Sequence, residues 1–404
     1  MNNETPLQEA ISALKSQYGQ DLFAKPALKN KKPKGLVKKI EIRNYKSIKQ
    51  TTVILTSLTI LVGINGSGKT NFLDAFGFIA EALRDRIDFA INSRGGFDSI
   101  VRGDNKRMSS FFSLKIDFEL DNGHLYSYKI RIKRNRYPGY SIDSEELLSK
   151  SGVHFKSKSG KLVDFSGNSP PAITSNGLHL ATFSGLEEFS KVFDFLSNIR
   201  LYSPNVEAMR TLSLPDSSLL LSRGAENVSS LLESIDRRGP KAKIMNYLRK
   251  INPVITSFAK RKYGKMETVM FASRHNRYYL SADSVSDGTL RAFAILIAIF
   301  QDESEGSPKL SLIGIEEPEA GLHPAAASVL MEALTVASKG KQILITTHSS
   351  DILESVDVNT NNIIYTSMTS DGTTNFVSIN EKTKEIIRRG LYNPGELFKM
   401  GQLI

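Results

Sequence analysis

The chain has 404 residues, of which 40% are hydrophobic and 24% charged, so its composition is ordinary for a globular protein and excludes global disorder. It contains no cysteine, which excludes disulfides, a thiol nucleophile and a thiolate metal site. The formal net charge of +11 favours contact with polyanions but does not determine the fold.

Nothing in the sequence indicates a membrane protein. The longest strongly apolar run, Leu290 to Phe300, is too short to span a bilayer. The first residues, "MNNETPLQEA", lack the charged-then-apolar layout of a signal peptide. We therefore expect a cytoplasmic protein with no membrane partner.

The basic charge is concentrated in two stretches. Residues 1–36 are predicted to form a short helix and then a basic linker, in which lysines crowd around prolines. The linker is either solvated or an arm that binds nucleic acid, and the solvated form is slightly favoured. In the second stretch Arg131 and Lys133 alternate with Ile130 and Ile132, which is typical of charged residues on the solvent-exposed face of a strand.

The first regular elements surround a glycine-rich loop. Ile40 and Ile42 alternate with polar neighbours and predict one strand, and "LTILV" predicts another that ends just before Gly63. Apolar residues at helical spacing predict the helix that follows the loop: Phe72, Phe76, Ile79, Leu83 and Ile87.

The loop itself, "GINGSGKT" at residues 63–70, fits G-x-x-x-x-G-K-[ST] between a strand and a helix. Its backbone N–H groups and the helix dipole would cradle the phosphates of ATP. Lys69 is expected to reach the β- and γ-phosphates, and the Thr70 hydroxyl to ligate Mg²⁺. The residues expected to bind nucleotide are Gly63, Asn65, Gly66, Ser67, Gly68, Lys69, Thr70 and Asn71.

The middle of the chain begins with a predicted antiparallel hairpin. Apolar residues alternate on both sides of an Asp-Asn-Gly turn in "FFSLKIDFELDNGHLYSYKIRIKR". Residues 141–265 are predicted to be a mixed, mainly helical insertion with helices in "GLEEFSKVFDFLSNI" and "NVSSLLESIDRRG". No sustained heptads occur there, so no long coiled coil is expected.

Two later apolar strands end in polar residues. "LSLIGI" runs into Glu316 and Glu317, and "QILIT" runs into His348. Two adjacent glutamates are common on any surface, and a lone histidine is more often structural. At strand ends in a nucleotide-binding core, however, Glu316 would hold Mg²⁺, Glu317 would polarise the attacking water, and His348 would be catalytic.

A second anion-binding loop, Ser286-Asp287-Gly288, precedes the apolar helix. A Ser/Gly loop at a helix start can bind an anion. The alternative is an ordinary helix cap formed by Ser286 or Asp287. The chain already has one phosphate cradle, so this loop would need a different ligand.

Four segments in this order, "GINGSGKTN", "SVSDGTLR", "IGIEEPEAGLHP" and "ITTHSSDI", resemble the ABC-type ATPases of the SMC and RecF group. They are most similar to RecF-like AAA family ATPases, including OLD-type proteins and anti-phage defence ATPases. The resemblance covers about residues 37–404 and extends to "IEIRNYKSI" and "GELFKMGQLI". It is specific to the superfamily but not to one biological role.

The resemblance implies an α/β P-loop ABC-type ATPase head with an antiparallel β subdomain and a helical insertion. Its first part would be residues 37–140 and its second part residues 266–404, on either side of the insertion. It also implies a homodimer, or a higher even-numbered homo-oligomer, in which Ser286 and Gly288 contact the γ-phosphate bound by a second subunit.

The sequence departs from the family pattern at three points. Asp287 stands where glycine is usual, and a carboxylate facing a phosphate would be repulsive, so we expect it to point away or to cap the helix. No glutamine lies between Gln50 and Gln301 to form the usual glutamine loop. Glu316 replaces the common aspartate, so hydrolysis is expected to be slow.

The predicted partner is a separate effector such as a nuclease. OLD-type nucleases carry a TOPRIM domain after the ATPase, whereas the residues after His348 predict a hairpin and short helices without a D-x-D cluster. The leading hypothesis is a defence-system ATPase that gates this effector. The alternatives are a RecF-like repair ATPase that contacts DNA through its basic surface, and an ATP-bound scaffold with little turnover.

Overall fold

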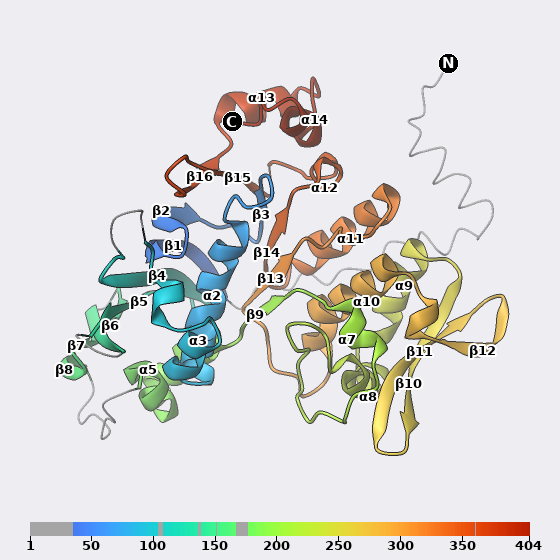
Figure 1. Cartoon of the computed structure of the whole chain (residues 1–404), viewed down its shortest axis with the longest axis horizontal. Coiled ribbons are helices and arrows are strands. Elements are labelled where there is room, and N and C mark those ends of the chain that lie inside the picture. The colour runs from blue at the N-terminus through green and yellow to red at the C-terminus, as the bar shows by residue number, and fades with distance from the viewer. Residues whose placement is uncertain (1–34, 104–107, 136–138, 151, 167–176, 360) are drawn as a thin grey trace. The chain divides into compact units, whose positions relative to one another are not determined.

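The computed structural model describes residues 35–404 except 104–107, 136–138, 151, 167–176 and 360 (Figure 1). The predicted N-terminal helix and most of the basic linker lie outside the described residues. The chain forms two units. The phosphate-loop unit contains residues 35–203, Pro308–Glu317 and Ala337–Ile404, and the signature unit contains Pro204–Ser307 and Pro318–Val336.

A mainly parallel sheet forms the centre of the phosphate-loop unit, with the strand order β16-β15-β3-β14-β13-β9. Neighbouring strands are parallel from β15 to β9, and β16 pairs antiparallel with β15. Every residue of β3 and β14 is buried, as expected for strands covered on both faces. The strands are β3 Leu58–Val62, β9 Ile199–Tyr202, β13 Leu312–Glu316, β14 Gln342–Thr347, β15 Asn362–Met368 and β16 Thr374–Ser378.

The same unit contains an antiparallel sheet of order β2-β1-β4-β5-β6-β7-β8. The predicted hairpin is confirmed as β4 and β5, and Gly123 closes its turn with φ +77° and an N–H bond of 2.9 Å to Leu120 O. The strands are β1 Gly35–Tyr45, β2 Ile48–Ile54, β4 Phe111–Leu120, β5 Leu125–Arg134, β6 Tyr140–Ser149, β7 Gly152–Lys158 and β8 Lys161–Phe165.

The alternation of apolar and charged residues in β5 buries the apolar side chains and leaves the charged ones on the other face, as predicted. Ile130 and Ile132 are fully buried, while Arg131 and Lys133 pair with Asp143 of β6 at 3.0 and 2.7 Å. Because β6 pairs with β5 and β7 extends the same sheet, the domain boundary expected near residue 141 falls inside this sheet.

A buried glutamine joins the two sheets. Gln342, at the start of β14, is 1% exposed, and its amide exchanges two hydrogen bonds of 2.8 Å with the backbone N and O of Val37 in β1. It also donates to Thr56 O at 2.9 Å. A side-chain amide thus satisfies backbone groups at a place where the two sheets do not pair directly.

The helices of this unit are short apart from α2, which follows the glycine-rich loop and contacts β9 and β14. Sequence periodicity extended this helix to Ile87, but it ends at Arg84, since Arg86 adopts φ +87° and starts a new helix. The helices are α2 Lys69–Arg84, α3 Ile87–Asn92, α4 Phe97–Ile100, α5 His179–Thr182, α6 Glu187–Ser197, α12 Ser350–Glu354, α13 Glu381–Arg388 and α14 Pro394–Lys399.

The signature unit is built around α10 Asp287–Phe300. All residues from Leu290 to Phe300 except Arg291 are buried, and Phe293 packs edge-on against Phe258 and Phe271 at ring distances of 4.8 and 5.1 Å. The other elements are α7 Val206–Arg210, α8 Val228–Arg238, α9 Lys241–Ile251, α11 Pro324–Ala337, and the sheet β10 Ile255–Tyr263, β11 Met266–Ser273 and β12 Asn276–Ser281.

The helices predicted in "GLEEFSKVFDFLSNI" and "NVSSLLESIDRRG" are confirmed as α6 and α8. The longest described helix, α2, has 16 residues, so the described part of the chain contains no long coiled coil, as predicted. Among the described residues, none of the helices has the length and apolar character needed to cross a membrane.

Candidate nucleotide site

The glycine-rich loop connects β3 to α2, and its lysine folds back across it. The Lys69 ammonium is buried and donates hydrogen bonds to Gly63 O at 2.7 Å and Ile64 O at 2.9 Å. The Ser67 side chain is 1% exposed, and its hydroxyl has no hydrogen-bond partner among the residues that the structure describes. A buried hydroxyl and a buried cation within one loop are polar groups that a phosphate would satisfy.

Gly68 is the residue of the loop that most needs to be glycine. Its φ is +95°, and a Cβ there would lie 2.0 Å from Thr374 Oγ1 of β16. Thr374 in turn shares a hydrogen bond of 2.7 Å with Ser47, which also accepts one of 2.7 Å from the Asn71 amide. Asn71, predicted to bind nucleotide, is therefore directed to Ser47 in this structure.

An ion cluster supports the start of α2, and sequence reasoning did not find it. Asp74 pairs with Lys46 at 2.6 Å and Arg94 at 2.9 Å, and it accepts a hydrogen bond of 2.7 Å from Tyr45 Oη. Burial alone raises the pKa of Asp74, but Arg94 and Lys46 outweigh it and hold the pKa below its usual value. The charged carboxylate thereby fixes the β1–β2 turn beside the loop, where Lys46 has φ +49°.

The strand register brings the predicted acid and loop to one edge of the central sheet. Glu316 is the Cα partner of Thr346, and Thr346 is the Cα partner of Leu61. Thr347 O also accepts a hydrogen bond of 3.3 Å from Gly63 N. The carboxylate at the end of β13 and the loop after β3 therefore flank the end of β14, at the carboxyl edge where ligands collect in such sheets.

Glu317 and His348, the two predicted catalytic residues, contact each other. Glu317 Oε1 lies 3.2 Å from His348 Nδ1, and both side chains are partly exposed, at 36% and 45%. Glu317 has φ +44°, a left-handed conformation that costs a non-glycine residue on the order of 1 kcal/mol. Its backbone N–H is held by Thr346 O at 3.0 Å. Strain at this glutamate is typical of a functional position.

The signature loop lies in the other unit. Ser286 is the N-cap residue of α10, but its side chain makes no capping hydrogen bond and pairs with Thr289 Oγ1 at 2.9 Å. Asp287 accepts a bond of 2.6 Å from Arg210. The helix-cap alternative therefore lacks the side-chain bond that defines it.

Gly288 is required by its packing within the signature unit. A Cβ at Gly288 would lie 2.1 Å from Gly321 O, in the segment that follows the paired glutamates. Any larger residue would push the start of α10 away from that segment. The backbone approach of two glycines explains the conformation of the loop independently of any ligand.

The residues at the carboxyl edge fit a magnesium-bound nucleoside triphosphate. Lys69 and the loop N–H groups could bind phosphate oxygens, and Thr70 and Glu316 could supply the hydroxyl and carboxylate for Mg²⁺. Thr70 is exposed and Glu316 half-buried, so both are accessible to a ligand.

A family comparison agrees with this geometry. Residues 58–354 match the family described as "AAA domain, putative AbiEii toxin, Type IV TA system". The chain belongs to this AAA ATPase family. The match includes the phosphate loop, the signature loop, the paired glutamates and His348.

The relatives of this AAA protein include OLD and SMC proteins. It is 24% identical to the Old nuclease of Escherichia phage P2 over 86% of the chain, and the match spans 62% of that nuclease's length. It is also 26% identical to the chromosome partition protein Smc of Mycoplasma genitalium, over 48% of this chain and 21% of that protein.

Solved structures of SMC heads show the same fold. An SmcHead bound to the C-winged helix domain of ScpA matches with a TM-score of 0.53 and 16% identity, covering 87% of this chain and all of that one. A second Smc head with an extended coiled coil, bound to the C-terminal domain of ScpA derived from Pyrococcus furiosus, matches with a TM-score of 0.53, 16% identity and 89% coverage of this chain. The AAA protein therefore has the α/β P-loop fold of an SMC head, as predicted.

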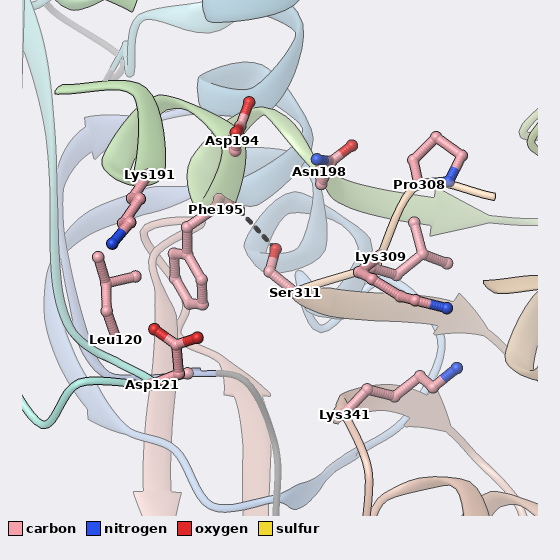
Figure 2. Close-up of a pocket in the computed structure, with 12 residues that line it drawn as sticks. Leu120, Asp121, Lys191, Asp194, Phe195, Asn198, Pro308, Lys309, Ser311 and Lys341 are labelled. Atoms are coloured by element: carbon pink, nitrogen blue, oxygen red, sulfur yellow. Dashed lines mark hydrogen bonds between the residues drawn. The ribbon is translucent and has the colours of Figure 1, made fainter. Parts of the chain in front are cut away.

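The AAA protein also has a pocket at the opposite edge of its central sheet (Figure 2). Its volume is about 450 Å³, and Lys309, Ser311 and Lys341 reach it from just before β13 and β14. Phe195 and Lys191 of α6 line the same pocket. Because Glu316 ends β13 and His348 follows β14, both at the other ends of these strands, the pocket is separate from the nucleotide site.

Proposed function

We propose that this protein binds ATP–Mg²⁺ at a composite interface between two copies of the chain and hydrolyses it slowly to control a separate effector. The observation that carries the proposal is the convergence of the Lys69 loop, Glu316, and the Glu317–His348 pair at one sheet edge. Family membership supports ATP use in general.

The chemical roles follow from position. Lys69 leaves its loop carbonyls to reach the β- and γ-phosphates, and the bound Mg²⁺ supplies charge neutralisation of those phosphates. Thr70 and Glu316 would hold the metal. Glu317, at a strained backbone position, accepts a proton from the attacking water, and His348 orients Glu317 through their 3.2 Å contact.

The second loop supports a composite site. Neither Ser286 nor Asp287 caps α10 in the usual way, so the N–H groups of its first turn remain suited to an anion. We assign that anion to the γ-phosphate held by a second copy. Two copies would then enclose two ATP molecules, each between a phosphate loop and a partner's signature loop, giving a homodimer or a higher even-numbered oligomer.

The effector is proposed to be a nuclease that acts in anti-phage defence. The similarity to the Old nuclease supports a link to nuclease action, and the resemblance of the sequence motifs to those of anti-phage defence ATPases supports the defence role. The alternative is a RecF-like DNA-binding ATPase in repair, which is supported by the net charge of +11 and by the similarity to Smc. Strongly salt-dependent DNA binding by the isolated chain would favour the repair protein.

An ATPase assay tests the enzymatic part of the proposal. Glu317→Gln should retain ATP binding and lose turnover, since an amide cannot accept the proton of the water. The matched control is Glu385→Gln, on the exposed helix α13, which should hydrolyse ATP normally. Equal turnover in all three proteins would exclude the proposed mechanism.

A further inference from the structure

An arginine outside every motif binds the signature loop. Arg210, the last residue of α7, donates through Nη2 to Asp287 Oδ1 at 2.6 Å and to Val285 O at 3.2 Å. Its Nη1 donates to Glu207 at 2.8 Å. The Arg210 side chain is 18% exposed, whereas the Asp287 side chain is 69% exposed. The hydrogen bond from Arg210 thus fixes a carboxylate that would otherwise be free to move in solvent.

The position of Arg210 is itself fixed. The Asn205 side chain caps α7 by accepting from Ala208 N at 3.3 Å, and Arg291 of α10 donates to Pro204 O at 3.2 Å. The segment 204–210 is therefore bonded to α10 at both of its ends. Hydrogen bonding to Asp287 also raises the pKa of Arg210.

Asp287 creates an electrostatic problem that Arg210 can solve. An unpaired carboxylate in a loop that meets a γ-phosphate would repel it, since like charges a few ångströms apart and shielded from water interact strongly. Pairing with Arg210 offsets the charge of Asp287 and turns the carboxylate toward α7, while Glu207, the other carboxylate bound by Arg210, lies on α7 and not in the loop. The bond to Val285 O holds the backbone that leads into Ser286.

We propose that Arg210 is a positioning residue for the signature loop. It offsets the charge of Asp287 and holds Val285, so that the N–H groups at the start of α10 can donate hydrogen bonds to the γ-phosphate of a second copy. This inference rests on the proposed composite site and adds to it the residue that makes an acidic signature loop compatible with ATP.

The test uses full-length protein carrying Glu317→Gln, so that bound ATP persists. Four forms are compared by sedimentation with and without ATP–Mg²⁺: the parent, Arg210→Ala, Asp287→Asn and the double variant. Arg210→Ala should weaken ATP-dependent dimerisation at least about tenfold. The double variant should recover most of this loss, because Asn removes the unpaired charge and keeps the shape.

Two further variants act as controls. Arg277→Ala removes an exposed arginine of β12 in the same unit and should dimerise like the parent. Arg210→Gln keeps the side-chain stem and one donor but removes the charge, so it should show the Arg210→Ala defect even if the alanine variant folds poorly. ATP affinity of the monomers should be unchanged in every variant.

Rescue of the Arg210 variants by Asp287→Asn would show that Arg210 acts by offsetting the Asp287 charge and not only by supporting the fold. If Arg210→Ala and Arg210→Gln dimerise like the parent, or if Asp287→Asn fails to rescue them, the inference is wrong. If the Glu317→Gln parent does not dimerise with ATP at all, the proposed composite site is wrong, and this inference fails with it.

Discussion

The phosphate loop and the signature loop both precede a helix, yet they satisfy their polar groups in opposite ways. In the phosphate loop, Lys69 bonds to two carbonyls of its own loop and is buried. In the signature loop, Ser286 and Asp287 are exposed, and Asp287 is held by an arginine from another helix. The phosphate loop already contains a cation, the ammonium of Lys69. The other loop presents backbone N–H groups and the hydroxyl of the exposed Ser286, which suits a ligand that arrives with its own metal and lysine.

The largest effect is expected from Ser286→Arg, which tests whether the signature loop acts between subunits. A bulky cation in the signature loop should abolish ATP-dependent dimerisation and hydrolysis while ATP binding to the isolated subunit stays nearly intact, because the phosphate loop is in a different unit. Light scattering with and without ATP, on the Glu317→Gln background, measures the dimer. Equal dimerisation with and without Ser286→Arg would leave the signature loop with no role between subunits.

Mixing variants sharpens the same test. A Lys69→Ala chain and a Ser286→Arg chain place both lesions in one composite site and leave the other site whole. Hydrolysis should reappear in the mixture although each variant alone is inactive, provided that hydrolysis at one site does not require hydrolysis at the other. The control is a mixture of Lys69→Ala with Glu317→Gln, whose lesions both concern the phosphate-loop side and therefore fall in different sites.

The next largest effect distinguishes the two glutamates. Glu317→Gln should lower turnover by about 10²-fold or more, as expected for loss of a general base, with ATP affinity retained. Glu316→Gln should instead weaken Mg²⁺ binding, so that hydrolysis requires a higher Mg²⁺ concentration, since it removes a proposed metal ligand and leaves the base. Normal hydrolysis by Glu317→Gln with loss in Glu316→Gln would show that the roles are reversed.

Lys69→Ala should weaken ATP binding by roughly 10- to 100-fold, since hydrogen bonds to a charged group contribute about 1.5–3 kcal/mol. The fold should persist, because the two carbonyls that Lys69 contacts lie at the loop and can bond to water. Calorimetry measures the affinity, and circular dichroism checks the fold. Unchanged affinity would contradict the assignment of the phosphate loop.

Motif residues could be predicted from sequence because phosphate chemistry imposes a spacing along the chain. Glu316, Glu317 and His348 were predicted at strand ends and Lys69 in the loop after a strand, and the register places these strand ends together. The strands β3, β13 and β14 are mainly apolar runs of five or six residues. β9 was missed because it has four residues, one of them Arg200.

The residues that sequence reasoning missed have partners far away along the chain. Arg210 meets Asp287 across 77 residues, and Ser47 meets Thr374 across 327. No local pattern records such pairs. β12 was missed for another reason: most of its side chains are exposed, so it lacks the alternation that predicts a strand.

The smallest expected effect concerns stability and compares two helix starts within the signature unit. Asn205 caps α7 with a side-chain bond to Ala208 N, so Asn205→Ala should lower the free energy of unfolding by about 1 kcal/mol. Ser286 makes no such bond at the start of α10, so Ser286→Ala should lower it by less than about 0.5 kcal/mol. Denaturant titration of both variants beside the parent measures the difference. A loss at Ser286 as large as that at Asn205 would mean that the serine caps α10 in solution, and the reason for assigning its loop to a second subunit's phosphate would disappear.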